Sequence, residues 1–567
     1  MLHILPYWRR YQKFILLAFM FLILEVVGDL LQPTIVSRII DDGVMEGDVN
    51  MVVRFGGLML AVAAFSACCA IMRCVISSKV SQDFGAALRL DLFTKINKFS
   101  FSALGSKETA GMITRMTNDT SQLVGFTNSL MRMFVRAPVL LTGAIIMTVL
   151  LNPRLALILL VVVPVIAALM FISLKVTFPL FKRMQAALDN NNSVIREYLS
   201  GVRVVKAYNT FDQEVERFDG TNTELVATAV KAQRTVGIFF PIISFTVNMG
   251  IVAMLWLARG WVADSTMQVG QVVAFLNYMM QISMSLRMIF NVYQMFIRAK
   301  ASAERVGEIL QEEDASLQLG TVHTVPSSFD NAIIFKNVSF TYPGGGEPVL
   351  QDINFTLPAG ETLGVIGSTG AGKTSLVQLI PGFYQPDSGE VIVGNDPNIS
   401  GDVLRSAIAY VSQQNSIFYG TIADNIRMGK ADATLEELEE AAKAAGAYEF
   451  IAAYPDGFET IVGQKGVNIS GGQKQRIGIA RALVRKAPIL ILDDCVSAVD
   501  VETEAQIMKS IRSIDPAPTC VMITQRISSV MNLQHILVLD NGRIAGLGNH
   551  EYLMTNCEIY REMYATK

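Results

Sequence analysis

The stretch GSTGAGKT, residues 367–374, decides the fold of the second half of this chain. It follows the apolar run TLGVI and precedes SLVQLIPGF, which has the pattern of a helix. Glycines let the backbone approach a phosphate closely, and the N-terminus of the following helix favours an anion. The stretch therefore predicts an α/β domain that binds a nucleotide, with Lys373 on the β- and γ-phosphates and Thr374 on Mg²⁺. The candidate nucleotide-binding residues here are Gly367, Ser368, Thr369, Gly370, Ala371, Gly372, Lys373, Thr374 and Ser375.

Long apolar runs occur only in the first half of the chain. Across 567 residues the hydrophobic share is 51%, the charged share is 17% and the mean hydropathy is +0.39, which exceeds the norms for soluble proteins. A bilayer core requires about 20 apolar residues per helix. This length predicts six membrane-spanning helices, at residues 14–38, 52–76, 128–151, 155–177, 236–260 and 266–295. The net charge of −3 gives no reason to expect nucleic acid as a partner.

The charges between the spans predict the orientation. The loop after the first span, IDDGVMEGDVN, carries four acidic residues and neither Lys nor Arg. The segment after the second span carries Lys79, Arg89, Lys95, Lys98, Lys107 and Arg115. Because basic residues stay on the cytosolic side, we expect both termini in the cytosol. We expect the chain in the plasma membrane, because no organellar targeting segment is recognised in the sequence.

The spans are expected to continue into the cytosol as helices. Residues 77–127 and 178–235 have a helical pattern, with bends expected at 104–111 and 207–213, and the last helix runs to about residue 310. A polar linker at 311–331 then separates a membrane domain, residues 1–310, from a nucleotide-binding domain, residues 332–567.

SGGQKQR, residues 470–476, makes the chain resemble a known family. It resembles the (L)SGGQ signature of ABC ATPases, with Ile469 in place of the leucine. Tyr342 in VSFTYPG resembles the aromatic residue that stacks on adenine, Gln413 in YVSQQ resembles the Q-loop glutamine, and SAVD, residues 497–500, resembles the D-loop. GMITRMTNDTSQL (residues 111–123) and VRVVKAYNTFDQEVERF (residues 202–218) resemble intracellular segments of type I ABC exporters. The resemblance covers nearly the whole chain and implies a half-transporter, an α-helical membrane domain fused to an α/β P-loop ABC ATPase domain.

The resemblance also implies how the site is assembled. In that family two ATPase domains pack head to tail, so each ATP lies between one chain's phosphate loop and the other chain's signature. ATP and Mg²⁺ are therefore the implied cofactors, and the implied metal-binding residues are Thr374, Gln413 and Asp493. The residues implied to close on ATP held by the partner chain are Ser470, Gly471, Gly472 and Gln473.

Two catalytic positions depart from the family's pattern. In ILILDDCVSAVD, residues 489–500, Asp493 is followed by Asp494 where hydrolytic members carry glutamate, and Gln525 stands where they carry histidine. Aspartate is one methylene shorter, so its carboxylate sits back by about 1.5 Å, and a misplacement near 1 Å can cost about 10²-fold in rate. We therefore expect a site that binds ATP and hydrolyses it slowly. The alternative is a tolerant site in which both substitutions are neutral.

An intact signature beside a weakened catalytic position resembles the degenerate-site half of heterodimeric ABC exporters. It implies a homologous partner chain that carries the glutamate and the histidine, and ATP-driven export of small amphipathic or hydrophobic molecules from the bilayer by alternating access. Three rivals stay open: an exporter half for lipids or peptides, a membrane-bound nucleotide sensor without transport, and a homodimer with two slow sites.

Charged residues in the membrane half give a weaker signal. Glu25 and Asp29 share one face of the first span near mid-membrane. Intramembrane acids can mark a substrate or cation path, and polar packing between helices is an equal alternative. Arg73 is expected near the inner boundary, with its charge reaching the interface.

Overall fold

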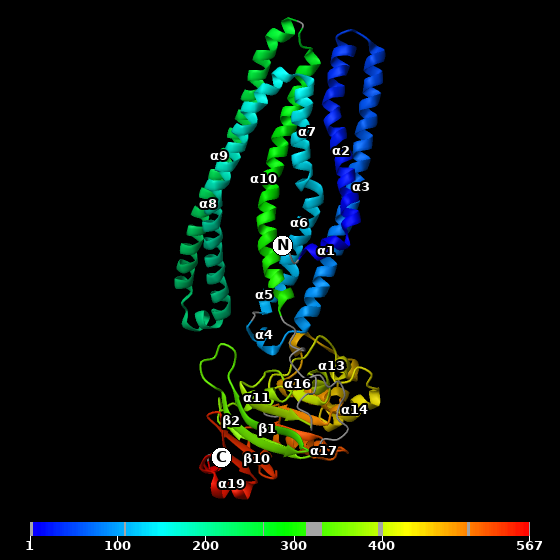
Figure 1. The fold of residues 1–567 in the computed structure, drawn as a ribbon. Helices are drawn as coiled ribbons and strands as arrows, with labels where there is room; N and C mark the ends of the chain where they lie inside the picture. The colour runs from blue at the N-terminus through cyan, green and yellow to red at the C-terminus, as the bar shows by residue number, and fades with distance from the viewer. Residues whose placement is uncertain are drawn as a thin grey trace. The chain divides into compact units, whose positions relative to one another are not determined.

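The computed structural model describes residues 4–106, 109–264, 266–312, 331–394, 401–495 and 499–565. It forms two compact units, which are described separately (Figure 1). The first comprises Met1–Phe93 and Ile113–Gln311, and the second comprises Thr94–Met112 and Glu312–Lys567.

The first unit is a bundle of long helices. Among the described residues, six helical segments are long and apolar enough to cross a membrane, which confirms the predicted fold class for this half. Its helices are α1 (Leu5–Arg10), α2 (Gln12–Arg38), η2 (Ile39–Val44), α3 (Val49–Asn97), η3 (Arg115–Asp119), α6 (Thr120–Ser129), η4 (Leu130–Phe134), α7 (Arg136–Leu151), α8 (Pro153–Tyr208), α9 (Phe211–Ala263) and α10 (Val269–Gln311). Two short helices, α4 (Phe101–Ser106) and α5 (Thr109–Thr114), lie in the bend predicted at 104–111, whose residues 107 and 108 are outside the described ranges.

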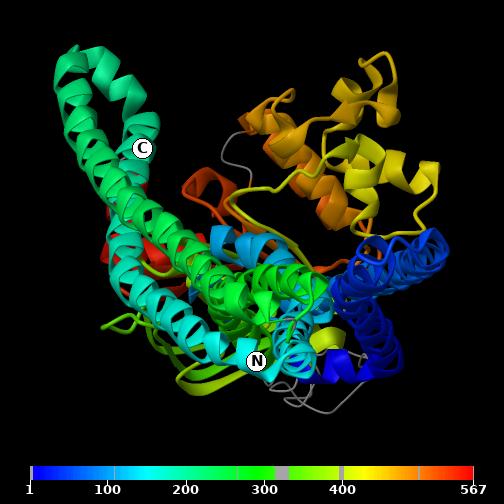
Figure 2. The ribbon, with the colours of Figure 1, turned by 90° about the horizontal axis from the view of Figure 1, so that it is seen from above.

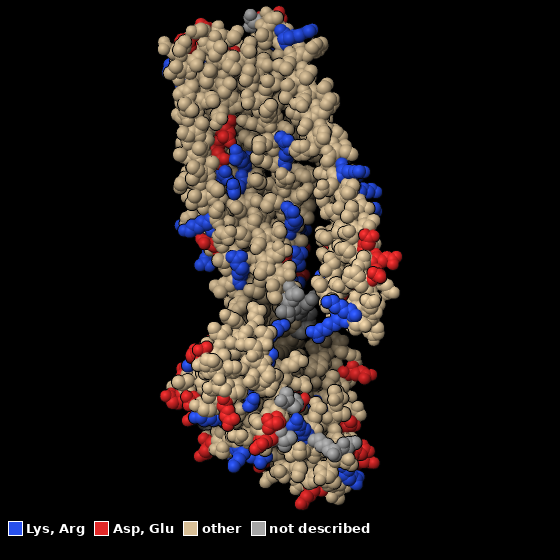
Figure 3. All heavy atoms as spheres, turned by 180° about the vertical axis from the view of Figure 1, so that it is seen from behind, with Lys and Arg blue, Asp and Glu red and all other residues tan. Residues whose placement is uncertain are grey.

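The helices pair within this unit. α8 and α9 form a long hairpin that turns at Asn209, whose φ of 53° is left-handed, inside the bend predicted at 207–213. Figure 2 shows the α2–α3 pair and the α8–α9 pair on opposite sides of α7 and α10. On the face in Figure 3, the upper part of this unit is mostly uncharged, with one group of acidic and basic side chains about halfway along it.

A proline in α2 explains a tight junction with α10. Pro33 has no N–H, so the carbonyl of Asp29, four residues earlier, loses its helical donor. Gln281 Nε2 on α10 donates to that carbonyl at 3.3 Å, and the buried phenol of Tyr278 donates to the next one, Leu30 O, at 2.7 Å. Side chains of α10 therefore donate to the α2 carbonyls just before Pro33.

The second unit contains the nucleotide-binding domain, which has two main sheets. A three-stranded antiparallel sheet has the order β2-β1-β4, and a six-stranded sheet has the order β11-β10-β3-β9-β8-β5, parallel except for β11. The strands are β1 (Asn331–Phe340), β2 (Leu350–Pro358), β3 (Thr362–Gly367), β4 (Ser388–Val393), β5 (Ile408–Val411), β6 (Gly420–Thr421), β7 (Ile461–Val462), β8 (Ile489–Asp493), β9 (Thr519–Ile523), β10 (His535–Asp540) and β11 (Arg543–Gly548). This parallel α/β core confirms the fold class predicted for the second half.

Helices flank the two sheets and carry separate parts of the site. They are α11 (Lys373–Leu379), α12 (Gly401–Ser406), α13 (Ile422–Arg427), α14 (Leu435–Ala444), α15 (Tyr448–Ala452), η6 (Gly457–Glu459), η7 (Gln464–Gly466), α16 (Gly471–Leu483), α17 (Val501–Arg512), α18 (Ile527–Val530), α19 (His550–Asn556) and α20 (Glu558–Ala565). In parallel α/β sheets, ligands bind outside the carboxyl ends of the strands. The chain leaves β3, β5, β8 and β9 at that edge, so the residues that follow these four strands converge there.

Candidate nucleotide site

The phosphate loop connects β3 to α11. Gly372 has a φ of 98°, and a Cβ at this position would lie 3.0 Å from Val349 O, so the turn needs glycine. Lys373 Nζ donates to Gly367 O and Ser368 O, each at 2.7 Å, so its side chain folds over the loop. Burial lowers the pKa of the Lys373 ammonium, although the nearby carboxylates Asp494 and Asp493 oppose that shift. This places a desolvated cation above the loop, where phosphate oxygens would bind.

Two of the three residues expected to hold Mg²⁺, Thr374 and Asp493, are in contact. Asp493 ends β8 with 1% of its surface exposed, and its Oδ1 accepts a hydrogen bond from Thr374 Oγ1 at 3.1 Å. Tyr410 OH donates to the other oxygen, Oδ2, at 2.9 Å. Burial raises the pKa of the Asp493 carboxyl, while its hydrogen bonds lower it. A hydroxyl beside a buried carboxylate fits Mg²⁺, which prefers oxygen ligands and would neutralise phosphate charge here.

Asp494 is held by two side-chain amides. Gln413 Nε2 and Gln525 Nε2 each donate to Asp494 Oδ2 at 3.1 Å, and only 5% of Asp494 is exposed. Its backbone φ is 46°, in the left-handed region, so the side chain leaves the end of β8 in a direction fixed by a constrained turn. Gln413, expected at the metal, and Gln525, expected at the catalytic centre, therefore meet at one oxygen of Asp494, the other residue expected at the catalytic centre.

Tyr342 closes the other end of the site. Its hydroxyl lies 2.9 Å from Ser375 Oγ and donates to Gln378 Oε1 at 3.2 Å. Its ring packs edge-on against Tyr384, with centroids 5.2 Å apart. A cavity of about 670 Å³ opens beside it, and Phe101 of α4 is also in its wall. Tyr342 is partly buried, and an aromatic ring beside a cavity can stack on a nucleobase.

The signature residues form a capped helix start. Ser470 caps α16, and its Oγ accepts from Gln473 N at 3.3 Å, while Gln473 Oε1 accepts from Ser470 N at 2.9 Å. Gly471 and Gly472 form the first turn of α16. In the described parts of the chain, no hydrogen bond joins these four residues to the phosphate loop. Of the D-loop, residues 497 and 498 lie outside the described ranges, and Asp500 caps α17 through Thr503.

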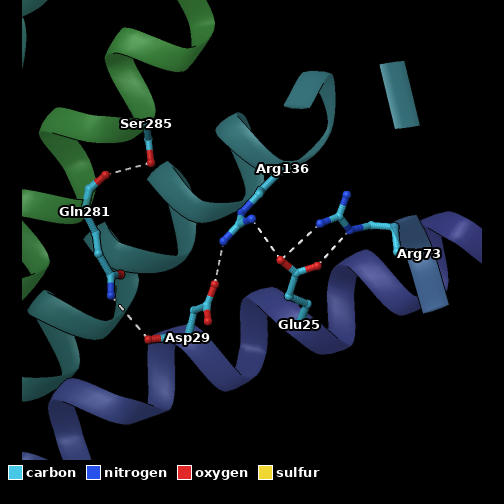
Figure 4. A network of polar contacts seen from close by, with 6 residues as sticks. All are labelled: Glu25, Asp29, Arg73, Arg136, Gln281 and Ser285. Atoms are coloured by element: carbon cyan, nitrogen blue, oxygen red, sulfur yellow. Dashed lines mark hydrogen bonds and ion pairs between the residues drawn. The ribbon is translucent and has the colours of Figure 1, made fainter. Parts of the chain in front are cut away.

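The acids of the first span lie in an ion-pair chain (Figure 4). Glu25 accepts from Arg73 Nε at 2.7 Å and from Arg136 Nη1 at 2.8 Å, and Arg136 Nη2 donates to Asp29 Oδ2 at 2.8 Å. Glu25 and Arg73 expose 4% and 5% of their surface, whereas the side chain of Asp29 exposes 26%. The expectation that Arg73 extends to the membrane interface is wrong, because its guanidinium turns inward to Glu25. For Glu25 the contacts favour polar packing between helices.

Two residues of these sites were missed in the sequence. Arg136 interrupts an apolar span, and that interruption was the available signal for a buried partner of Glu25. Tyr410 gave no signal, because a tyrosine in a short apolar strand resembles ordinary core.

Comparisons with known proteins agree with this geometry. A family model described as "ABC transporter transmembrane region" matches residues 15–286, and one described as "ABC transporter" matches residues 350–497. A Bacillus subtilis protein described as an uncharacterized ABC transporter ATP-binding protein is 36% identical over 553 residues, covering 97% of this chain and 96% of that protein. An ATP-dependent lipid A-core flippase of Thiobacillus denitrificans is 29% identical over 566 residues, covering 99% of this chain and 96% of that protein. A solved bacterial Atm1-family ABC exporter with ATP bound has a TM-score of 0.82, 25% identity and 98% coverage of both chains.

Proposed function

Because this chain belongs to the ABC transporter family, as an exporter half with a membrane domain fused to an ABC ATPase domain, we propose that it is the slowly hydrolysing half of a two-chain exporter. Its own phosphate loop, Thr374 and Asp493 hold ATP with Mg²⁺, and its signature completes the site of a homologous partner. The partner supplies the catalytic glutamate and the switch histidine.

The convergence of two amides on Asp494 carries this proposal. A general base must accept a proton from the attacking water, and the two N–H donors on Asp494 Oδ2 occupy the acceptor positions of that oxygen. Neither glutamine can take up a proton or carry the charge of a histidine. By contrast, Lys373 and the Thr374–Asp493 pair keep the contacts needed to hold phosphates and metal. The residues that would bind ATP in this site are therefore different from those that would hydrolyse it.

The signature supports a partner rather than a lone slow chain. Ser470 and Gln473 form a complete capping box, so the start of α16 is well ordered for contact with a phosphate held by another chain. In this scheme ATP binding closes the paired ATPase domains, the bends at α4 and between α8 and α9 transmit the closure, and hydrolysis at the partner's site resets it. The acidic loop around Asp41 and Asp42 faces outward, and the ATPase domain and both termini lie in the cytosol at the plasma membrane.

Copurification followed by an ATPase assay tests the proposal. Tagged chain is purified from its native membrane, and we expect a second half-transporter with glutamate and histidine to accompany it. Replacing that partner's glutamate by glutamine then removes most of the ATPase activity of the pair. Recovery of this chain as a homodimer, or activity unchanged by the partner's substitution, contradicts the proposal.

The substrate we propose is a small amphipathic or hydrophobic molecule, and a lipid is the second candidate. The lipid is favoured by the relatives named as lipid A-core flippases, at 29–30% identity over nearly the whole chain. ATP-dependent accumulation of a lipophilic dye and ATP-dependent movement of a labelled lipid, measured in vesicles that contain the pair, separate the two. A sensor without transport would give neither signal.

A further inference from the structure

The phenol of Tyr410 is a donor to Asp493 from outside the nucleotide-binding motifs. Tyr410 lies on β5, which pairs in parallel with β8, and its register partner is Ile491, two residues before Asp493. Its phenol donates to Asp493 Oδ2 at 2.9 Å.

Two donors on different oxygens fix the plane of the Asp493 carboxylate. Thr374 Oγ1 lies 3.1 Å from Oδ1, and Tyr410 OH lies 2.9 Å from Oδ2. Because Thr374 belongs to the phosphate loop, Oδ1 is the oxygen that faces the expected metal. Tyr410 holds the opposite oxygen and so prevents the carboxylate from turning away from that site.

The ring of Tyr410 connects to the intracellular bend through one aromatic residue. It packs edge-on against Phe383, with centroids 5.5 Å apart and planes at 77°. Phe383 in turn stacks on Phe101, the first residue of α4, with centroids 4.2 Å apart and planes at 23°. Close aromatic pairs of this kind stabilise each other beyond the burial of their surfaces. All three residues belong to the second compact unit.

Phe101 also packs against Tyr384, which in turn packs against Tyr342, the residue expected to stack on adenine. Tyr384 lies 6.4 Å from Phe101 between ring centroids, and 5.2 Å from Tyr342. One side chain of α4 therefore touches two neighbouring aromatics, of which Phe383 leads toward the metal carboxylate and Tyr384 toward the adenine-stacking ring.

We propose that Tyr410 is a positioning residue for the metal-binding carboxylate, and that Phe101 controls it through Phe383. A displacement of α4 then alters the metal site through packed rings, in addition to any effect through Gln413. The proposal rests on the proposed function only in requiring that this chain's own site binds ATP with a divalent cation.

Metal affinity, measured apart from turnover, tests the role of Tyr410. Mn²⁺ binding to the full-length chain is followed by electron paramagnetic resonance in the presence of a non-hydrolysable ATP analogue. Tyr410→Phe removes only the hydroxyl, and we expect Mn²⁺ affinity to weaken about tenfold. Binding of a fluorescent ATP analogue without metal stays unchanged. Tyr560→Phe is the matched control, because it removes a buried phenol of the same domain that contacts His550 instead.

The control of Tyr410 by Phe101 through Phe383, here called the relay, is tested with Phe101→Ala and Phe101→Leu. We expect Mn²⁺ affinity to weaken in the alanine variant and to recover in part with leucine, which restores contact with Phe383. Mn²⁺ affinity of Tyr410→Phe within about twofold of the wild type overturns the positioning role. A normal affinity in Phe101→Ala overturns the relay. Failure of the wild-type chain to bind the fluorescent analogue would instead overturn the proposed function.

Discussion

Restoring the two catalytic side chains should restore turnover at this chain's own site. Asp494→Glu moves the carboxylate outward by about 1.5 Å, one carbon–carbon bond. In the structure the carboxylate oxygen lies 3.1 Å from both glutamine amides, so the longer side chain carries it past the pair that holds it. Gln525→His removes one of those donors and supplies a ring that can carry a proton.

The size of the effect follows from the role of a base. A positioned general base contributes about 10²–10⁴ in rate, and a misplacement near 1 Å costs about 10²-fold. We therefore expect the double variant to hydrolyse ATP at least about tenfold faster than the wild type, and Asp494→Glu alone to gain less because Gln525 still donates to the carboxylate.

Phosphate release by the purified pair is the assay, with the partner's glutamate replaced so that only this chain's site turns over. Asp456→Glu is the matched control, since it adds the same methylene at an exposed position of the same domain. Lys373→Ala gives the background. If the double variant binds nucleotide normally and its rate stays within about twofold of the wild type, the assignment of Asp494 as the limiting defect is refuted.

Three further predictions concern stability, each measured as a melting temperature in detergent. Gly28→Ala places a methyl group 1.9 Å from Ser66 Oγ and should lower the free energy of unfolding by about 1–3 kcal/mol. Adding Ser66→Ala leaves the new methyl group 3.3 Å from the Cβ of residue 66 and should recover most of that loss. Equal losses in the single and double variants would contradict this steric explanation. Glu25→Ala leaves two arginines without their shared carboxylate and should cost about 3–5 kcal/mol, whereas Asp29→Ala, at a quarter-exposed side chain, should cost less; equal shifts would contradict the burial argument. The backbone N–H of Thr421, at the cap of α13, donates to Asp424 and holds the pKa of its carboxyl below the ordinary 3.8, so its stabilisation is fully present above pH 3.8 and is lost as the pH falls through the lowered pKa; Asp424→Ala should therefore melt below the wild type at about pH 7, and the difference should shrink as the pH falls below 3.8.

The sequence located the parts of the nucleotide site because each part follows a strand. Apolar runs ending in a glycine loop, in Asp493 and before Gln525 are local patterns, and parallel strands bring their ends to one edge. The strand order is not local. β8 lies between β9 and β5, and that order is why Gln525 and Gln413 approach Asp494 from its two sides. The hydrophobic periodicity of the sequence does not specify the strand order, so the contact of both glutamines with Asp494 could not be predicted.

The membrane half shows the same limit more strongly. Glu25 and Asp29 have similar sequence surroundings, so no local pattern separates their roles. Their partners lie 48 and 107 residues away, so only the packing of α2 against α3 and α7 distinguishes them. The tight approach at Gly28 brings α2 against α3, and Glu25 is buried one turn earlier. Asp29 lies one turn later, four residues before Pro33, where its side chain stays partly exposed.

In the proposed function, different side chains bind ATP and support its hydrolysis. We expect Lys373 to contact the phosphates and the Thr374–Asp493 pair to contact the metal, while the base position depends on Asp494. A change at Asp494 would therefore lower turnover without removing a group expected to bind ATP. In the proposed pair, hydrolysis weakens the nucleotide-bound contact, so a site that binds ATP and cleaves it slowly would keep its contact to the partner's signature for longer than the hydrolytic site. An exporter with one such site need not separate its two ATPase domains fully in each cycle, which shortens the path back to the closed state.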